Sequence, residues 1–415
     1  MPDLIKKIMQ KKAVIAVMGL GYVGLPTALA FTGAGFRVIG IDSDPGKAKK
    51  LRSKMHKTSS DPKVLRQADV ILICVPTPLN KNKAPDLSCV IDASKDIAVN
   101  MREGQLVVLE STTYPGTTEE IVLPILEKSG LKANRDFHLA FSPERIDPGN
   151  KKFNLSNTPK VVGGLNAAAT KLSEALYASI STNIVTVSSP RVAEMEKLFE
   201  NIFRSVNIAL ANEMAILCRR MKIDVWEVIA AASTKPYGFM AFYPGPGLGG
   251  HCIPLDPFYL SWKAKEHDLH TRFIELAGEI NTAMPYHVVN VIGDALNEKG
   301  KSLSGSKIFI LGVAYKKDID DMRESPAVKI IETLKEKGAQ VYYNDPFIPG
   351  IKIKGKTYKS VKLTKSMLRR SDCSVIVTNH SAYDYQDIVE GSKVVVDTRN
   401  ATKHVTRGRD RIVRL

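Results

Sequence analysis

A stretch dense in glycine and proline surrounds one cysteine in the second half of the chain. The run Tyr243–Pro257 reads YPGPGLGGHCIPLDP, and so many turn-forming residues exclude a helix or a central strand. We therefore expect a shaped loop that presents Cys252 with little side-chain bulk on its N-terminal side. A thiol presented in this way is a candidate nucleophile. Free cysteines are more often small buried apolar residues, but the composition of this loop favours the nucleophile.

A second candidate site lies near the N-terminus. An apolar run, residues 13–18, leads directly into Gly19-Leu-Gly21-Tyr-Val-Gly24, and a helix-compatible segment and a second apolar run ending in Asp42 follow. This is the G-x-G-x-x-G pattern in its full strand-turn-helix-strand-acid context, where backbone N–H groups reach a pyrophosphate. Asp42 would accept hydrogen bonds from both ribose hydroxyls, which favours NAD over NADP, although Lys47 lies nearby.

Polar loops follow the next three predicted strands, residues 70–75, 106–109 and 138–141, and two more strands are expected at 160–162 and 184–187. Ligands of an open parallel sheet bind outside the carboxyl ends of its strands. These loops are therefore expected to face cofactor and substrate. Their candidate residues are Thr77, Ser111, Thr112, Glu144, Arg145 and Asp147.

The pattern becomes helical from about residue 191, with apolar residues at i, i+3, i+4 and i+7. Lys197, Asn201 and Arg204 line up on another face of this helix. Such a polar face is usually solvated, but the nearby cysteine loop favours a ligand-facing stripe. A second helix is expected at about 273–298, and the two predict a helical middle domain that forms a dimer seam.

The C-terminal part predicts a smaller parallel sheet with strands at 306–311, 340–343, 374–378 and 394–397. Three acids in the loop after the first of these strands, Asp318, Asp320 and Asp321, could suggest a metal site. Because lysine and arginine alternate with them, a salt-bridged loop is the better interpretation, and no metal is expected. Arg399 follows the last of these strands.

Composition sets the class of the protein. A chain of 415 residues is too long for one core, so two or three domains are expected. The formal net charge of +16 is spread along the chain without a basic block or an RNA-binding motif, so nucleic acid is not the expected partner. Residues 13–36 carry no charge, but their glycines predict a strand and a helix rather than a membrane span. Five cysteines and no signal peptide predict a cytoplasmic protein without a disulfide framework; Cys74, Cys218 and Cys373 lie in apolar runs and are expected in the core.

An NAD site together with a loop cysteine narrows the reaction. A simple alcohol dehydrogenase needs no thiol, whereas a thiolate can add to an aldehyde and give a thiohemiacetal from which a second hydride leaves. The resulting thioester is hydrolysed to a carboxylate. Lys197 is the best candidate for the base or for a cation that stabilises an oxyanion. His251 and Cys252 alone supply too few ligands for zinc.

These motifs resemble one known family in order along nearly the whole chain. GLGYVGLP, VPTPLN, ESTTYPGTTEE, SPERIDPGN, GPGLGGHCIPLDPFYL and AYKKDIDDMRESPA are similar to the UDP-sugar 6-dehydrogenases of the UDP-glucose/GDP-mannose dehydrogenase family. The HCIP form of the cysteine loop resembles the UDP-N-acetylhexosamine branch. TKPYGF and DPFYLSWKA resemble its UDP-N-acetylglucosamine members.

The resemblance implies an α/β fold in which two Rossmann-like, doubly wound parallel-sheet domains are joined by a central helical domain. It implies an NAD-binding domain at 1–190, a helical dimerisation domain with the cysteine loop at 191–299 and a UDP-sugar-binding domain at 300–415. It also implies a homodimer that oxidises the C6 alcohol of UDP-N-acetylglucosamine to a uronic acid in four electrons, with two NAD per turn.

Roles carried over by resemblance make Cys252 the nucleophile and Lys197 the acid/base or oxyanion group, with Asn201 and Asp256 beside them. Thr112 and Glu144 are implied to place water and the sugar. The implied NAD contacts are Gly19, Gly21, Tyr22, Val23, Gly24, Asp42, Lys47, Thr77, Thr112 and Arg323. The implied contacts to the UDP-sugar are Glu144, Arg145, Ile146, Lys197, Asn201, Arg204, Gly249, Lys316, Lys317 and Arg399.

One segment departs from the family. Between Leu51 and Asp69 the family has a longer helical segment, and this chain is short by about one helix on the adenosine side. Three alternatives therefore stay open: the same chemistry on UDP-N-acetylmannosamine or UDP-glucose, a nucleotide-sugar-binding homologue with impaired turnover, and a nucleic-acid binder.

Overall fold

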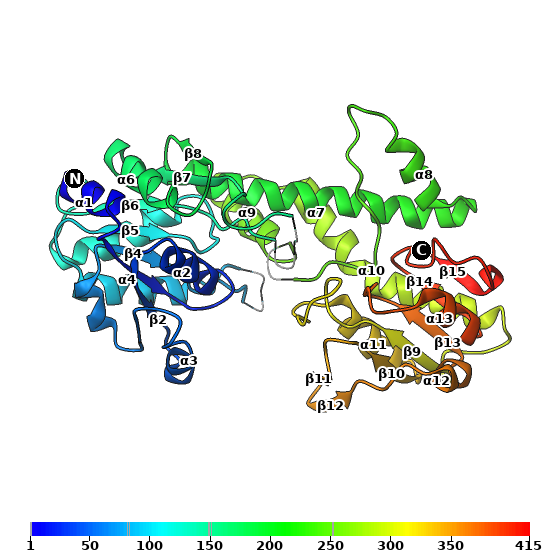
Figure 1. Cartoon of the computed structure of the whole chain (residues 1–415). Coiled ribbons are helices and arrows are strands. Elements are labelled where there is room, and N and C mark those ends of the chain that lie inside the picture. Colours follow the sequence, from blue (N-terminus) through cyan, green and yellow to red (C-terminus); the bar gives the residue numbers. More distant parts are fainter. Residues whose placement is uncertain (1, 81, 83, 148–149, 151, 251–252) are drawn as a thin grey trace. The chain divides into compact units, whose positions relative to one another are not determined.

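The computed structural model describes residues 2–80, 82, 84–147, 150, 152–250 and 253–415. The chain forms two compact units (Figure 1). The N-terminal unit holds Met1–Glu200 and Phe258–His270, and the C-terminal unit holds Asn201–Pro257 and Thr271–Leu415.

One mixed sheet forms the centre of the N-terminal unit, in the order β3-β2-β1-β4-β5-β6-β7-β8. Its strands are β1 Val14–Met18, β2 Arg37–Ile41, β3 Lys57–Ser59, β4 Val70–Ile73, β5 Leu106–Leu109, β6 His138–Phe141, β7 Lys160–Gly164 and β8 Ile184–Val187. The strands predicted from apolar runs are thus confirmed. The parallel sheet expected for this domain needs one correction, because β7 pairs antiparallel with β6 while the other pairs are parallel.

Alternate residues of the central strands supply two cores, one on each face of this sheet. Ile15 and Val17 of β1 pack in a cluster with α1, α2 and α6, whereas Ala16 and Met18 pack with η1, α4 and α5. A strand that is buried on both faces must be apolar at every position, which is why these strands read as continuous apolar runs. The helices of the unit are α1 Pro2–Met9, α2 Gly24–Gly33, α3 Pro45–Lys50, α4 Ser88–Asn100, α5 Leu123–Leu126, α6 Ala167–Tyr177 and α9 Asp256–Ala264, with the short turns η1 Pro62–Gln67, η2 Thr117–Val122, η3 Glu127–Ser129 and η4 Lys265–His267.

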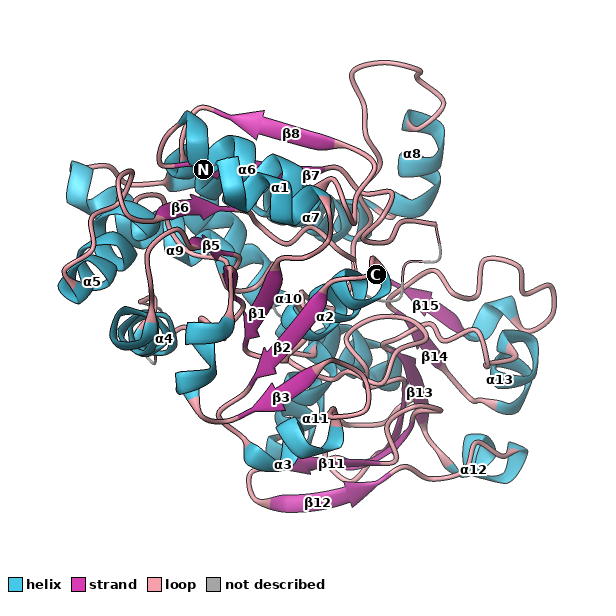
Figure 2. Ribbon diagram, turned by 60° about the vertical axis from the view of Figure 1, so that its left-hand side comes forward, coloured by secondary structure: helices cyan, strands magenta, loops and turns pink. Residues whose placement is uncertain are grey.

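The shortened segment between Leu51 and Asp69 contains β3 and η1. Figure 2 shows β3 beside β2 at the edge of the sheet, where it pairs in parallel through Ile39, Gly40 and Ile41. Only a three-residue strand and a 3-10 turn therefore follow α3 before β4 begins.

Helix α7, Pro190–Met221, runs from the N-terminal unit into the C-terminal unit, and the predicted change to helix near residue 191 is confirmed. The other helices of the C-terminal unit are α8 Val225–Ala232, α10 Arg272–Asn297, α11 Pro326–Glu336, α12 Lys365–Arg370 and α13 Tyr385–Gly391, with the turn η5 Arg409–Arg411. Its parallel sheet has the order β10-β9-β13-β14-β15. The strands are β9 Lys307–Leu311, β10 Gln340–Asn344, β13 Cys373–Ile376, β14 Val395–Asp397 and β15 Ile412–Arg414, beside a separate hairpin of β11 Gly350–Ile353 and β12 Lys356–Lys359.

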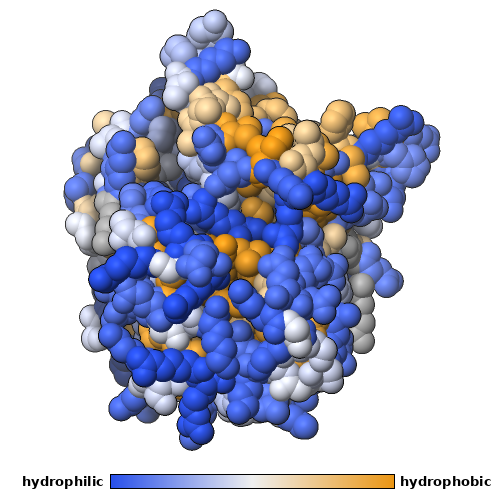
Figure 3. Space-filling model, turned by 90° about the vertical axis from the view of Figure 1, so that its right-hand side faces the viewer, coloured by the Kyte–Doolittle hydropathy of each residue, from blue (hydrophilic) through white to orange (hydrophobic). Residues whose placement is uncertain are grey.

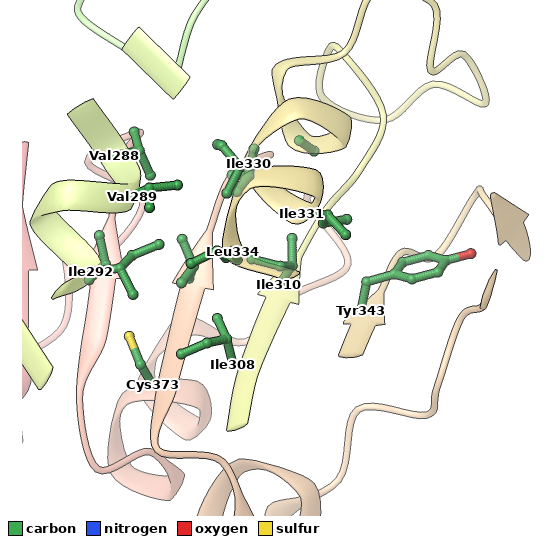
Figure 4. Packing of buried hydrophobic residues seen from close by; sticks show 14 of the residues in the cluster. Val288, Val289, Ile292, Ile308, Ile310, Ile330, Ile331, Leu334, Tyr343 and Cys373 are labelled. Carbon is green, nitrogen blue, oxygen red and sulfur yellow. The ribbon is translucent and has the colours of Figure 1, made fainter. Parts of the chain in front are cut away.

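The core of the C-terminal unit, like that of the N-terminal unit, consists of one hydrophobic cluster on each face of the sheet. Figure 4 shows Ile308 and Ile310 of β9 facing side chains of α10 and α11. The alternate residues Phe309 and Leu311 belong to a second cluster with α12 and α13. The sheet is therefore covered by helices on both faces, as expected of a doubly wound domain.

A tight glycine turn follows the first strand of each unit. Gly19 has φ +88°, and a Cβ there would lie 2.7 Å from the Cys74 carbonyl oxygen at the end of β4. Gly312 has φ +82°, and a Cβ there would lie 2.4 Å from the Thr378 carbonyl oxygen beyond β13. Both positions exclude a side chain, so the predicted similarity between the two ends of the chain extends to the turn after the first strand.

Within the described ranges, no helix is both long enough and apolar enough to cross a membrane. Cys74, Cys218 and Cys373 are buried and free, which confirms their predicted place in the core, whereas Cys89 is exposed.

Candidate functional site

The three glycines of the G-x-G-x-x-G pattern, Gly19, Gly21 and Gly24, have different surroundings. A Cβ on Gly24 would lie 1.9 Å from the Gly19 carbonyl oxygen, so these two glycines are fixed by packing. A Cβ on Gly21 would meet nothing within 4 Å. The open glycine is the one that lets the backbone approach a pyrophosphate.

Helix α2 begins directly after this turn without a side-chain cap. Its N-cap residue is Val23, which makes no capping hydrogen bond, and the preceding Tyr22 is exposed. The first N–H groups of a helix have no partner within the helix and carry its positive dipole end. The turn and the helix start therefore fit the phosphate groups of a dinucleotide.

Asp42 lies at the end of β2 and is 9% exposed. Its Oδ2 accepts from the Leu20 N–H at 2.9 Å and lies 2.8 Å from Lys47 Nζ, while Oδ1 accepts from the Asp44 N–H at 3.1 Å. Burial raises the pKa of Asp42, but these hydrogen bonds outweigh burial and leave the pKa below its ordinary value. The carboxylate is thus ionised at neutral pH, and Lys47 is engaged with it rather than with a separate anion.

The loops after β4 and β5 are tied together. Thr77 Oγ1 donates to the Thr112 carbonyl at 2.8 Å, and Ser111 Oγ donates to the Val75 carbonyl at 2.8 Å. The Tyr259 hydroxyl of α9 donates to the Thr77 carbonyl. Two segments with predicted cofactor residues therefore form one surface at the carboxyl ends of adjacent strands.

A buried carboxylate fixes the next part of the same loop. Glu194 of α7 is fully buried, and it accepts from the Gly116 N–H at 2.6 Å, from the Thr118 N–H at 2.9 Å and from the Thr118 hydroxyl at 2.7 Å. Burial raises the pKa of Glu194 to about 7, against the lowering effect of these donors. Glu194 was not among the residues predicted from sequence, because its partners lie far away along the chain.

The loop after β6 brings Glu144 against two backbone donors. Its Oε1 accepts from the N–H groups of Arg145 at 2.8 Å and Ile146 at 2.7 Å, and its Oε2 lies 3.4 Å from Lys160 Nζ. The backbone N–H groups of Arg145 and Ile146 thus hold Glu144 in place.

Arg145 faces acids of α7. Its Nη2 pairs with Glu200 and lies 3.4 Å from Glu196, while Nη1 donates to the Pro159 carbonyl at 2.8 Å. The guanidinium charge is therefore neutralised within the N-terminal unit, and a contact with substrate would have to compete with this pair.

Lys197 and Asn201 lie one turn apart on α7 and are 8% and 4% exposed. Lys197 forms no hydrogen bond or ion pair within the described part of the chain, which is uncommon for a lysine this buried. Asn201 Nδ2 donates to Asp256 Oδ2 at 2.5 Å. Arg204, predicted on the same stripe, is exposed.

The glycine-rich stretch before the cysteine packs closely on the loop after β9. A Cβ on Gly249 would lie 2.6 Å from Tyr315 Cβ, and Gly250, with φ +89°, donates its N–H to the Arg323 carbonyl at 3.0 Å. Only glycine fits this close approach. His251 and Cys252 lie outside the described residues, so the predicted presentation of the thiol stays a prediction.

A buried amide chain anchors the start of this stretch. Asn212 of α7 accepts from the Gly245 N–H at 2.9 Å and donates to Asn281 of α10 at 2.9 Å, and Asn281 in turn donates to the Ser205 carbonyl at 3.0 Å. The two asparagines could have been suspected as polar residues in apolar helices, but only the structure pairs them.

Arg399, a predicted substrate contact, and Arg323, a predicted NAD contact, both lie in loops that follow strands of the C-terminal unit. Arg399 is partly buried beside Gly245, and its Nε donates to the Val377 carbonyl at 3.1 Å. Burial lowers the pKa of Arg399 to about 10, against the opposing charge of Asp397. Arg323 is held by a bidentate pair with Asp321, with its Nη2 2.6 Å from Oδ2.

The loop with Lys316 and Lys317 is held at its base by Asp345. This carboxylate ends β10 and accepts from the N–H groups of Val313 at 2.6 Å and Ala314 at 2.9 Å. His380 is fully buried, accepts from the Asp318 N–H on Nδ1 at 3.0 Å, and therefore donates from Nε2 to Asp345 at 3.0 Å. Asp345 directly follows the second strand of its unit, as Asp42 does in the N-terminal unit. This position is the sequence signal that could have identified Asp345.

The carboxylates of the acidic loop after β9 bind separate partners. Asp318 accepts from Ser381, and Asp321 binds Arg323. Among the described residues, no three His, Cys, Asp or Glu side chains are grouped as metal ligands.

Three models of one family match the chain in order. The NAD binding domain of the UDP-glucose/GDP-mannose dehydrogenase family matches residues 13–59 and 52–181, its central domain matches 191–283, and its UDP binding domain matches 309–404. The two pieces of the NAD-binding match meet in the shortened segment.

Known relatives cover most of the chain. A UDP-N-acetyl-D-glucosamine 6-dehydrogenase of Pseudomonas aeruginosa is 38% identical over 80% of this chain and 83% of its own. A UDP-N-acetyl-D-mannosamine dehydrogenase of Pyrococcus horikoshii is 35% identical over 94% of this chain and 96% of its own. The solved structure of a UDP-D-ManNAc dehydrogenase from Pyrococcus horikoshii superposes with a TM-score of 0.87 at 34% identity, covering 97% of this chain and 98% of that one. The glycine turn, the strand-end acid and these matches together show that this protein belongs to the UDP-glucose/GDP-mannose dehydrogenase family and is an NAD-dependent oxidoreductase.

Proposed function

We propose that the protein oxidises the C6 alcohol of UDP-N-acetylglucosamine to the uronic acid in two NAD-dependent steps. UDP-N-acetylmannosamine is the first alternative substrate and UDP-glucose the second. Relatives named for N-acetylglucosamine and for N-acetylmannosamine match this chain at similar identity, so an assay has to decide between them.

The observation that carries this proposal is that Lys197 is nearly buried and has no hydrogen-bond or ion-pair partner among the described residues. A nearly buried amine without a hydrogen bond or ion pair inside the described residues is available to a reacting group. One turn along the helix, Asn201 is fixed by Asp256, which follows Cys252 by four residues in the sequence. Lys197 acts as the base for the C6 hydroxyl and as the cation beside the oxyanion.

NAD, when bound, accepts a hydride in each of the two steps. In the first step Lys197 takes the hydroxyl proton and the C6 hydride leaves, which gives an aldehyde. The Cys252 thiolate then adds to the aldehyde carbon, and the second hydride departs from this thiohemiacetal to leave a thioester.

Water completes the reaction. It adds to the thioester carbon with its proton accepted by Glu144, and the C–S bond breaks with its electron pair left on sulfur. One alcohol, two NAD⁺ and one water thus give one carboxylate, two NADH and three protons. Thr112, on the surface tied to Thr77, orients the sugar and the water.

The cofactor fits the N-terminal unit. The open Gly21 and the uncapped start of α2 suit the pyrophosphate, and the Asp42 carboxylate suits the ribose hydroxyls and repels a 2′-phosphate. The other proposed NAD contacts are Tyr22, Val23, Lys47, Thr77 and Arg323.

The diphosphate of the substrate needs cations that are not already neutralised. Arg399 has no carboxylate partner within the described residues, and burial already disfavours its unpaired charge, so an anion beside it is favourable. Lys316, Lys317 and Arg204 are the other proposed cations. Arg145 and Ile146 contribute through the loop that holds Glu144, and Gly249 lets the sugar approach the backbone.

A panel of UDP-sugars tests the substrate assignment. NADH formation is followed with UDP-N-acetylglucosamine, UDP-N-acetylmannosamine and UDP-glucose at equal concentration. The highest kcat/KM is expected with the first sugar. A higher value with either of the others would replace it, and an absence of NADH with all three would refute the proposal.

The shortened segment supports a second candidate, a nucleotide-sugar-binding homologue with impaired turnover. Only β3 and η1 lie between α3 and β4 on the adenosine side, and the NAD-binding match divides there. Calorimetry separates the two candidates: micromolar binding of UDP-sugar without NAD binding or turnover would favour the impaired homologue.

We also propose a homodimer formed through the middle helices, which act as a dimerisation domain. Phe203, Leu210, Met214, Leu217 and Met221 form a stripe on α7 at helical spacing and are 37–59% exposed. The side of the same helix next to this stripe packs through Ala215 and Cys218 on Val225, Trp226 and Ile229 of α8. Figure 3 shows hydrophobic surface gathered in the upper part of the face that it presents. A stripe of this length favours burial against a second copy.

A further inference from the structure

A cluster of ionisable side chains lies inside the N-terminal unit, below the strand ends that carry the proposed site. Glu110 ends the β5 region, Lys160 begins β7 and Tyr177 ends α6, and they are 0%, 5% and 0% exposed. Cys74, whose backbone packs against Gly19, is the fourth member. Only Glu144, at the upper end of the cluster, has been given a role in the reaction.

Lys160 connects the two carboxylates of this cluster. Its Nζ lies 3.4 Å from Glu144 Oε2, 3.5 Å from Glu110 Oε2 and 4.9 Å from the centre of the Tyr177 ring. Glu110 Oε1 accepts from the Tyr177 hydroxyl at 2.5 Å, and Cys74 Sγ lies 3.8 Å from Oε2, the oxygen that also faces Lys160. The order Glu144, Lys160, Glu110, Tyr177 is therefore continuous through the interior.

Lys160 controls one oxygen of Glu144. Oε1 is occupied by two backbone N–H groups, and within the described residues Lys160 is the only side chain that donates to Oε2. A lysine held in place by Glu110 and by the face of Tyr177 can fix the direction of that oxygen. Without it, only the short backbone loop would orient the carboxylate.

The charge balance argues against a purely structural ion pair. Lys160 and Glu110 alone would form a neutral buried pair, but Glu144 adds a second carboxylate to the same ammonium. Burial raises the pKa of Glu110, and the charge of Glu144 raises it further while Lys160 opposes both. Because buried charges are costly even when paired, an arrangement with surplus negative charge is a poor way to gain stability.

We propose that Lys160 is a positioning residue that directs Glu144 Oε2 toward the water of the thioester hydrolysis, with Glu110 as the counter-ion that holds Lys160. The inference rests on the proposed function, because it concerns the step in which Glu144 receives the proton of that water. Lys160 itself touches neither water nor substrate, and it acts through Glu144.

A charge-balanced double variant tests this role. Lys160→Met alone would leave Glu110 buried without its cation, so Lys160→Met is combined with Glu110→Gln. Glu110→Gln alone is the control, since it removes the same carboxylate and leaves Lys160 beside Glu144. We expect the double variant to lose about 10²-fold in kcat relative to this control, as misplaced catalytic groups do.

The burst of NADH before steady-state turnover distinguishes a positioning role of Lys160 from a general structural effect. Both hydrides leave before hydrolysis, so the double variant should release two NADH per active site in a burst and then turn over slowly. Its KM for the UDP-sugar and its affinity for NAD should stay within about threefold of the control. A structural defect would lower the burst amplitude with the rate.

Each outcome decides a separate claim. A double variant with the kcat of its control and no burst overturns the role of Lys160 while the proposed function stands. A wild-type protein that forms no acid from any UDP-sugar overturns the proposed function itself. If thermal unfolding shows that the double variant does not fold, Lys160→Gln combined with Glu110→Gln, which keeps a polar side chain at both positions and leaves no unpaired buried charge, takes its place with the same expected burst.

Discussion

Single residues of the cofactor site make a sharp prediction about NAD and NADP. Asp42→Asn keeps the shape of the side chain but removes the charge that is proposed to bind the ribose and to repel a 2′-phosphate. We expect kcat/KM with NAD to fall about tenfold and the preference for NAD over NADP to shrink. Initial rates with both cofactors measure this.

Asp44→Asn is the matched control, because its side chain accepts from Gly46 at the start of α3 rather than facing the ribose position. Its cofactor preference should equal that of the wild type. An unchanged NAD preference in Asp42→Asn would remove Asp42 from the site.

Glu194 makes a prediction about stability and pH. Its pKa is about 7 in the folded protein, against 4.5 as the ordinary value. The folded state therefore holds a proton that the unfolded chain releases, and stability falls as pH rises from about 4.5 to 7. For a fully buried group, this difference amounts to about 3 kcal/mol.

Glu194→Gln isolates that contribution, since its side chain does not titrate. The free energy of unfolding of the variant is compared with that of the wild type at pH 5 and pH 8. The wild type should lose more than the variant between these values. A constant difference between the two proteins would show that Glu194 does not titrate in this range.

At the residue scale, the sequence was sufficient for residues whose role depends on local pattern. The glycine turn and the acid at Asp42 follow from spacing along one segment. Glu110, Lys160 and Tyr177 were not predicted, because their pairing depends on two strands and a helix meeting in space. Glu194 was not predicted from the sequence for the same reason.

At the scale of elements, the close packing before the cysteine predicts a local effect. Gly249→Ala would place a Cβ 2.6 Å from Tyr315 and 3.0 Å from the Glu324 carbonyl. We expect the C-terminal unit to lose about 2 kcal/mol of stability and the KM for UDP-sugar to rise, because the loop must shift.

Gly350→Ala is the control in the same unit. Gly350 lies in β11, and a Cβ there would meet only the Tyr358 carbonyl at 3.6 Å, an ordinary contact. Both variants are compared by thermal unfolding and by titration with UDP-sugar and NAD. Equal behaviour of the two would show that the packing on Tyr315 has no consequence.

Elements were predicted well where burial on both faces left an apolar run, as in β1, β4 and β5. The direction of β7 was not predictable, because an apolar run carries no information on parallel or antiparallel pairing. The strand β15 and the hairpin β11–β12 were missed, since their residues are mostly half-exposed or charged and form no apolar run.

At the scale of the whole molecule, the proposed dimer predicts that a charge in the stripe of α7 separates two copies. Leu217→Glu would bury a carboxylate in an apolar interface, which is strongly unfavourable. Light scattering after size exclusion should give the mass of a dimer for the wild type and of a monomer for the variant. Lys299→Glu, at an exposed position beyond α10, is the control and should remain dimeric.

A wild-type protein that elutes as a monomer would contradict the proposed dimer but would leave the proposed reaction unaffected.

Family membership and the two sheet-containing parts of the chain followed from its motifs. The substrate did not, because an equatorial and an axial N-acetyl group differ by the placement of a few atoms in a pocket that no motif specifies.

The central claim is that one protein carries a C6 alcohol through both oxidations to the acid. It is tested most directly by converting a limiting amount of UDP-N-acetylglucosamine to completion and counting NADH and carboxylate. We predict two NADH and one uronic acid for each sugar consumed, and no acid from Cys252→Ser. One NADH per sugar with an aldehyde product, or an unchanged yield of acid from the variant, would contradict the account.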